Sequence, residues 1–367
     1  MRPLFLLKKI REVPLNSYLD SIHDPLTLRA KQFHMRQEAK RYIKMVREQK
    51  KRTVVDAKLL KKIKAYAHEY FGSKDYWPWL VLYSEIRGEF MEGWVPSDYY
   101  RLRLLKKLNP VHSSFLCFKK TFDHRLFGDI ASTWIVSKIN NTLFDMDMNV
   151  LNETSALEKI RAVNGEVVIK KESGRGGKDI DFMDSSQISH EMLSRNFDFL
   201  VQEVVKQHQD IAAVYPDSVN TLRITTYMEF SSNVRVLYAC MRIGSDGRRV
   251  DNHSAGGRVI FFDDSGTCVT DAYHGKTMEV ETHHPQTGYQ YRNLQISSLE
   301  RAKEICIRNH YKYPYLRLIG WDVFIDRENN PRLIEWNGKY PGFWPFEAII
   351  GPLWSLEEIQ KFRDMGI

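Results

Sequence analysis

The sequence lacks several features that would place it in a familiar class. It has only four cysteines in 367 residues, and none of them forms a CxxC pair. We therefore expect neither a disulfide framework nor a cysteine zinc site. No apolar run approaches the roughly 20 residues that a membrane-spanning helix needs. The apolar stretch near the first residue is too short for a signal peptide. These absences favour a cytoplasmic protein in a reducing compartment.

Common catalytic signatures are also missing. The glycine-rich stretch at 174–177 satisfies neither GxxxxGK[ST] nor GxGxxG. No GxSxG motif and no convincing Cys/His pair is present, which argues against a protein nucleophile. His283 and His284 are neighbours, so they point to opposite sides of an extended segment. No further Cys or His stands at a suitable zinc spacing, and we expect no metal there.

Positive charge is concentrated in one part of the chain. Residues 1–120 contain 26 Lys and Arg against 12 Asp and Glu, or +14, while the remainder carries −6 and the whole chain +8. Solvated helix faces are the ordinary explanation. The alternative is attraction to an anionic partner such as a sugar nucleotide, a lipid phosphate or an acidic polymer. Nucleic acid has the least support, because no zinc knuckle, RNP motif or similar module occurs.

The apolar pattern predicts a change of architecture near residue 113. Segments 25–51 and 56–72 show helical spacing, whereas strands and glycine-containing loops follow later. We predict an α+β protein with a mostly helical, basic region at 1–112. Two α+β regions, 113–205 and 206–367, would follow it.

The most informative segment is 318–341, which predicts two strands joined by a polar turn at 327–331. Such a hairpin folds Asp322 back toward Glu335 and Asn337. The last two are two residues apart and so share one face of their strand. Two carboxylates and an amide oxygen suit a hard cation such as Mg²⁺. An ordinary hairpin with a polar edge is the alternative.

Three other segments could contact a nucleotide. A strand ends at Lys170 and runs into the glycine-rich loop, whose backbone N–H groups could approach phosphates. Gln202 and Glu203 interrupt an apolar strand, as at a hinge where backbone groups could read an adenine edge. Arg223 could clamp a phosphate with its paired donors. A hairpin tip, a strand end and a surface salt bridge are the respective ordinary explanations.

Taken in order, these motifs resemble the ATP-grasp superfamily. The series runs from Lys170 and its glycine loop through QEVV at 202–205, Arg223 and DNHSAGG at 251–257, to Asp322 and the E-x-N that ends at Asn337. The stretches RIGSDGRRVDNHSAGGRVIFFD, HHPQTG and RLIGWDVFID resemble most the sugar-transfer-associated branch of that superfamily. The resemblance covers about residues 115–345. It implies a fold in which two α+β subdomains grip ATP.

The resemblance also implies roles for individual positions. An early lysine should reach the phosphates, and Lys119 and Lys120 are both candidates, of which we take Lys120. The implied nucleotide ligands are Lys120, Lys170, Ser173, Gly176, Gly177, Gln202, Glu203, Val205 and Asp322. The implied catalytic residues are Lys170 and Arg223, and the implied ligands of one or two Mg²⁺ ions, or of Mn²⁺, are Asp322, Glu335 and Asn337. Lys171 departs from the family pattern, because many relatives have proline there.

The implied activity is an ATP- and Mg²⁺-dependent ligation of a carboxylate to an amine through an acyl phosphate. The branch suggests small-molecule substrates, namely a sugar acid or a sugar-linked amine of polysaccharide biosynthesis. Two alternatives stay open. One is a kinase that phosphorylates a hydroxyl, and the other is a non-catalytic nucleotide-binding partner of a polysaccharide assembly system.

Overall fold

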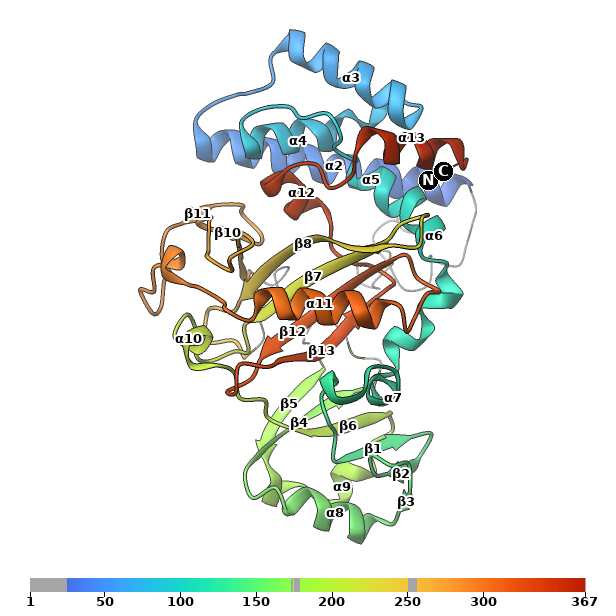
Figure 1. Cartoon of the computed structure of the whole chain (residues 1–367), viewed down its shortest axis with the longest axis vertical. Helices are drawn as coiled ribbons and strands as arrows, with labels where there is room; N and C mark the ends of the chain where they lie inside the picture. The colour runs from blue at the N-terminus through green and yellow to red at the C-terminus, as the bar shows by residue number, and fades with distance from the viewer. Residues whose placement is uncertain (1–24, 173, 175–178, 250–255, 367) are drawn as a thin grey trace, which may run out of the picture. The chain divides into compact units, whose positions relative to one another are not determined.

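The computed structural model describes residues 25–366, except 173, 175–178 and 250–255 (Figure 1). The expected nucleotide ligands Ser173, Gly176 and Gly177 lie outside the described residues, as does most of the segment at 251–257. The chain divides into two compact units. Within the described residues, the helical unit comprises 25–104 and 344–366, and the two-sheet unit comprises 105–343.

The helical unit is built from both ends of the described chain. Its elements are α2 (Pro25–Lys50), α3 (Ala57–Phe71), η2 (Lys74–Tyr76), α4 (Trp77–Arg87), α5 (Ser97–Tyr99), η3 (Tyr100–Leu104), α12 (Trp344–Ile350) and α13 (Leu356–Asp364). Helix α3 is capped at its start by Asp56, whose carboxylate accepts a hydrogen bond from the Leu59 N–H, and at its end by Gly72, which has a φ of 75°.

The described residues 344–366 group with the helical unit, whereas our division of the sequence placed 344–367 with 206–343. The Trp344 ring lies 5.2 Å from that of Tyr42 and 5.4 Å from that of Trp79. The carboxylate of the fully buried Glu347 accepts a hydrogen bond from the Val95 N–H at 3.2 Å. These aromatic and polar contacts lie within the helical unit, so burial assigns the C-terminal segment to it.

The small sheet of the two-sheet unit is antiparallel, with strand order β3-β2-β1-β6-β4-β5. Its strands are β1 (Val136–Ile139), β2 (Thr142–Phe144), β3 (Val150–Leu151), β4 (Glu166–Lys171), β5 (Ile180–Asp184) and β6 (Phe199–Glu203). The helical segments before and within it are α6 (Leu105–Leu108), η4 (Val111–Phe118), η5 (Lys120–Phe122), α7 (Asp123–Phe127), η6 (Gly128–Ile130), α8 (Glu153–Arg161), η7 (Ser185–Gln187) and α9 (His190–Leu193). Leu157 and Ile160 of α8 form a core with Val167 and Ile169 of β4. The opposite face of β4 therefore carries Lys170.

The large sheet has strand order β11-β10-β9-β8-β7-β12-β13 and is also antiparallel. Its strands are β7 (Thr221–Met228), β8 (Val234–Ile243), β9 (Arg258–Phe261), β10 (Ala272–His274), β11 (Val280–Glu281), β12 (Leu318–Ile325) and β13 (Pro331–Asn337), with α10 (Gln209–Ala212), η9 (Tyr291–Asn293) and α11 (Leu299–His310) between them. Helix α11 packs against β7, β8, β12 and β13 (Figure 1). Leu222, Ile224 and Trp321 belong to the core on this side, which leaves the alternate residues for the other face.

The structure confirms the predicted α+β class and the helical region before the sheets. The predicted hairpin is β12–β13, in which Asp322 is the register partner of Glu335 and Gly320 that of Asn337. Among the described residues, no helix combines the length and apolar character that a membrane span requires.

Candidate nucleotide and metal site

Asp322 lies at the centre of a charged cluster on the large sheet. It is fully buried on β12, between Arg223 on β7 and Glu335 on β13, which are its register partners. Nε and Nη2 of Arg223 donate hydrogen bonds to Oδ1 and Oδ2 of Asp322 at 2.5 and 2.9 Å. Nη2 of Arg242 on β8 lies 3.1 Å from Oδ2. Burial by itself raises the pKa of Asp322, but the two guanidinium groups lower it to about 2.

Glu335 and Asn337 adjoin Asp322 on the same face of the hairpin. Nδ2 of Asn337 donates to Oδ2 of Asp322 at 3.2 Å. Burial and the neighbouring charge of Asp322 raise the pKa of Glu335. Within the described part of the chain, no three His, Cys, Asp or Glu side chains are arranged to hold a metal ion. A metal site here therefore needs the Asn337 amide as its third donor. The all-oxygen donor set and the mutual repulsion of two carboxylates fit a hard divalent cation.

Two lysines of the small-sheet region reach the same cluster. Burial lowers the pKa of Lys170 to about 8, while the charge of Glu335 acts to raise it. Nζ of Lys120 donates to the carbonyl of Gly174 at 2.9 Å, at the edge of the glycine-rich loop. Nζ of Lys119 instead lies 5.6 Å from the centre of the Phe115 ring. Of the two candidate lysines, Lys120 is the one that the structure places beside Lys170.

The expected hinge residues lie at the end of β6. Gln202 is buried, and its Nε2 donates to the carbonyl of Thr133 at 3.0 Å. It is the register partner of Val168, so it shares the sheet face that carries Lys170. Glu203 is exposed at the end of the strand, and Val205 follows in irregular chain. The backbone beyond β6 thus leaves the sheet beside the face that carries Lys170.

Three residues of the cluster were not among the predicted site residues. They are Asp123, Glu172 and Arg242. Oδ1 of Asp123 accepts a hydrogen bond from Nε1 of Trp336 at 2.8 Å, and burial raises the pKa of Asp123 to about 8. Oε1 of Glu172 accepts from Oγ1 of Thr121 at 2.9 Å. Of the three, only Arg242 could have been found from the sequence. It lies next to the end of a strand, and polar residues near the loops that follow strands often bind ligands.

The raised pKa of Asp123 predicts a pH-dependent stability. An unfolded Asp titrates near 4, so folding opposes ionisation of Asp123 between about pH 4 and pH 8 and stability is lost as pH rises through that window. Asp123→Asn keeps an oxygen for Trp336 and removes the ionisation. The variant should match the wild type at pH 4 and exceed it by at least about 1 kcal/mol at pH 8. Urea unfolding at both pH values measures this, and a pH-independent difference would contradict it.

The small antiparallel sheet presents lysines, and the larger sheet presents carboxylates and arginines. Together the two sheets define a class of nucleotide-binding protein. The profile of the family described as sugar-transfer associated ATP-grasp matches residues 101–353, which is more than half of the chain. The chain belongs to this family, and its two sheets are the subdomains of an ATP-grasp fold.

Solved structures with a similar fold include the ATP-grasp ligase PsnB complexed with a minimal precursor, at 15% identity and a TM-score of 0.39. The match covers 70% of this chain and 63% of PsnB. Biotin carboxylase from Campylobacter jejuni is 10% identical, with 63% and 42% covered and a TM-score of 0.41. Carboxyaminoimidazole ribonucleotide synthase from Aspergillus clavatus is 11% identical, with 63% and 47% covered and a TM-score of 0.38. The chain thus spans less than two thirds of each of these proteins. No curated protein matches it.

Proposed function

We propose that this protein is an ATP- and Mg²⁺-dependent ligase that joins a carboxylate to an amine. The observation that carries the proposal is the convergence of Lys170 and Lys120 with the Asp322–Arg223–Arg242 cluster and Glu335. Four basic side chains around two carboxylates suit a polyphosphate bound together with a divalent cation. Family membership supports the same assignment.

The proposed reaction has two steps. A carboxylate oxygen of the substrate attacks the γ-phosphorus of ATP, forming an acyl phosphate and releasing ADP. The amine then attacks the acyl carbon, forming the amide, releasing phosphate and losing one proton. Catalysis of this kind needs charge neutralisation and alignment rather than a protein nucleophile, which agrees with the absence of a nucleophile motif.

Individual residues would contribute as follows. Lys170 and Lys120 would bind phosphate oxygens from the small-sheet side. Arg223 uses two donors on Asp322, so it would fix that carboxylate and add positive charge beside the transferred phosphoryl group. Asp322, Glu335 and Asn337 would hold Mg²⁺, which when bound neutralises phosphate charge. Backbone groups after Gln202 would bind adenine.

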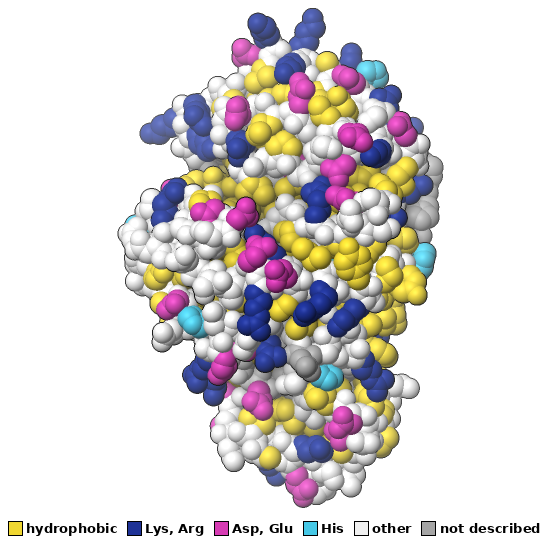
Figure 2. Space-filling model, in the orientation of Figure 1, with side chains coloured by type: hydrophobic (Ala, Val, Ile, Leu, Met, Phe, Trp, Pro, Cys, Tyr) yellow, Lys and Arg dark blue, Asp and Glu magenta, His cyan; other side chains and the backbone are white. Residues whose placement is uncertain are grey.

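The proposal also includes a class of substrate and the pathway type and compartment in which the reaction takes place. The family description supports a sugar acid or a sugar-linked amine as substrate, and we place the reaction in polysaccharide biosynthesis in the cytoplasm. The helical unit would meet an anionic partner, because α2 and α3 together carry 12 Lys and Arg against 3 Asp and Glu. Figure 2 shows basic side chains interspersed with acidic ones on the visible face of this unit.

Product analysis tests the proposal. Purified protein with ATP, Mg²⁺ and panels of carboxylates and amines should release ADP and phosphate only when both substrates are present. Mass spectrometry should detect the amide. A stable phosphorylated product without free phosphate would instead identify a kinase, and the absence of any nucleotide turnover would leave only a binding role.

Lys170→Met should weaken nucleotide binding while preserving the fold. A charged hydrogen-bond donor to phosphate contributes about 1.5–3 kcal/mol, so the Kd for a non-hydrolysable ATP analogue should rise about 10- to 100-fold. The wild-type Kd should also rise above about pH 8, where Lys170 loses its proton. Calorimetric titration measures both effects. Lys159→Met on the exposed side of α8 is the matched control, and equal Kd values for the two variants would contradict the role.

A further inference from the structure

The segment between β8 and β9 starts in the large sheet and reaches the small one. It leaves β8 one residue after Arg242 and returns to the sheet at Arg258. Within it, Nη1 and Nη2 of Arg249 each lie 2.6 Å from one oxygen of Glu166, at the start of β4. The same guanidinium group lies 3.6 Å from the centre of the Phe182 ring on β5. Arg249 thus contacts two strands of a sheet that is not its own.

These contacts fall on the face of the small sheet that carries Lys170. Glu166 and Lys170 stand four residues apart on β4, so both point to the same side, about 13 Å apart along the strand. Phe182 is the register partner of Val168, which lies between them on that side. The Lys170 end of this face meets the charge of Glu335 on the large sheet. The face therefore lies near the large sheet at its Lys170 end, and at its Glu166 end it is bonded to the chain that follows β8.

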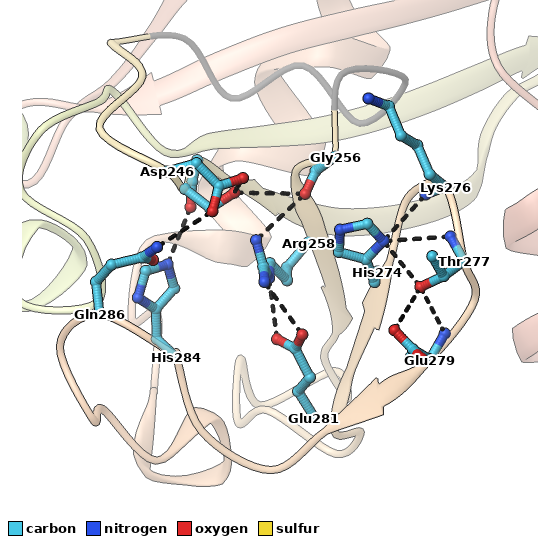
Figure 3. A network of polar contacts seen from close by, with 12 residues as sticks. Asp246, Gly256, Arg258, His274, Lys276, Thr277, Glu279, Glu281, His284 and Gln286 are labelled. Carbon is cyan, nitrogen blue, oxygen red and sulfur yellow. Dashed lines mark hydrogen bonds and ion pairs between the residues drawn. The ribbon is translucent and has the colours of Figure 1, made fainter. Parts of the chain in front are cut away.

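The described residues at the two ends of the segment, on either side of 250–255, are bonded to the large-sheet region. Figure 3 shows that both of its ends are bonded to residues 281–286. These bonds join Gly244 to His284, Asp246 to Gln286 and Arg258 to Glu281, at 3.0, 3.2 and 2.9 Å. Arg258 is 5% exposed, and a buried, paired guanidinium holds a fixed orientation. Arg249 therefore reaches the small sheet from a base that belongs to the large sheet.

We propose that Arg249 and Glu166 are positioning residues that hold the small sheet against the large one around the bound nucleotide. The proposal rests on the function proposed above. Neither residue belongs to the charged cluster, so the pair acts through Lys170, whose distance from Asp322 and Glu335 depends on how the sheets are held. Loss of the pair should therefore release nucleotide faster without removing any phosphate ligand.

The contact geometry sets the size of the expected effect. Both side chains are about two-fifths exposed, and exposed ion pairs usually contribute less than about 1 kcal/mol. Paired hydrogen bonds and stacking on an aromatic ring place this pair at the upper end of that range. Loss of the pair corresponds to a change of about three- to fivefold in a dissociation rate, and a charge reversal, which adds repulsion, to a change of up to about tenfold.

The positioning role of Arg249 can be distinguished from a purely local role within the small sheet. Glu166 is the register partner of Asp184, and like charges in that relation destabilise a sheet. If Arg249 only neutralised this repulsion, Glu166→Gln would relieve it and leave nucleotide release unchanged. If the pair joins the two sheets, Glu166→Gln removes the tie and release accelerates.

Stopped-flow release of a fluorescent ADP derivative from the full chain in Mg²⁺ tests the proposal. Arg249→Glu and Glu166→Arg should each release the nucleotide about three- to tenfold faster, and Glu166→Gln about threefold faster. The double exchange Arg249→Glu with Glu166→Arg should return the rate to within about twofold of wild type. High salt screens the phosphate contacts of both proteins but the Arg249–Glu166 pair of the wild type alone, so it should accelerate release more in the wild type than in Arg249→Glu.

Arg195 and Asp181 provide the matched control. Their ion pair spans 3.0 Å, is exposed and adjoins Phe197, but both partners belong to the small-sheet region. Arg195→Glu and Asp181→Arg should leave the release rate unchanged. Wild-type rates in the Arg249 and Glu166 variants, or a double exchange that fails to restore the rate, would overturn the positioning role alone. A wild-type protein that binds no nucleotide would overturn the proposed function as well.

Discussion

Replacing Glu335 with glutamine is expected to reduce ATP turnover about a thousandfold or more. Glu335 faces Asp322 across the hairpin, and its proposed role is to bring the second negative charge to the divalent cation. Glutamine keeps the shape and one oxygen but removes that charge. A metal ion at a transferring phosphoryl group contributes several kcal/mol, and each 1.36 kcal/mol changes a rate tenfold. Release of ADP and phosphate at saturating ATP measures the loss.

The same substitution should not damage the fold. Burial and the charge of Asp322 disfavour ionised Glu335, as its raised pKa shows, so a neutral amide should leave the free energy of unfolding equal or higher. Glu328→Gln, at the exposed turn of the same hairpin, should retain full turnover. A Glu335→Gln protein with more than about a tenth of wild-type turnover would exclude the metal role.

Replacing Arg223 with alanine should lower the free energy of unfolding by about 3–5 kcal/mol at neutral pH. Removing one partner of a buried ion pair leaves the other charge without its compensation, and Asp322 is fully buried. Arg242 remains as a second partner, which favours the lower end of that range. Arg223→Lys keeps the charge but not the paired donors, so it should lie between alanine and wild type.

The effect of Arg223→Ala should depend on pH. The folded pKa of Asp322, about 2, lies below its unfolded value near 4. Its contribution to stability is therefore complete above pH 4 and is lost as pH falls from 4 to 2. The difference between variant and wild type should be largest above pH 4 and shrink below it. Urea unfolding from pH 2.5 to 8 measures this difference.

An exposed ion pair provides the comparison for this prediction. Arg292 pairs with Asp271 at 2.8 Å on the surface, so Arg292→Ala should cost less than about 1 kcal/mol. If Arg223→Ala cost no more than that control, Asp322 would not depend on its buried partner. A pH-independent difference would equally contradict the assignment.

Local patterns in the sequence were sufficient for the hairpin and the class of fold. Alternation within two short strands and a polar turn between them predicted that Asp322, Glu335 and Asn337 share one face, because a hairpin brings neighbouring segments together without help from the rest of the chain. The order of motifs then predicted the ATP-grasp family, which the profile match confirms. The roles of the individual site residues stay proposals.

What the sequence determined by itself was therefore the hairpin, the α+β class and the family, since these depend on spacing along the chain. Only the tertiary structure decided that Arg242 and Arg223 both hold Asp322, that Asp123 is buried against Trp336, and that Trp344 and Glu347 belong to the helical unit. It also brought Arg249 to Glu166. Each of these contacts joins residues far apart in the chain, and it forms because strand order and burial, which no local pattern specifies, place them together.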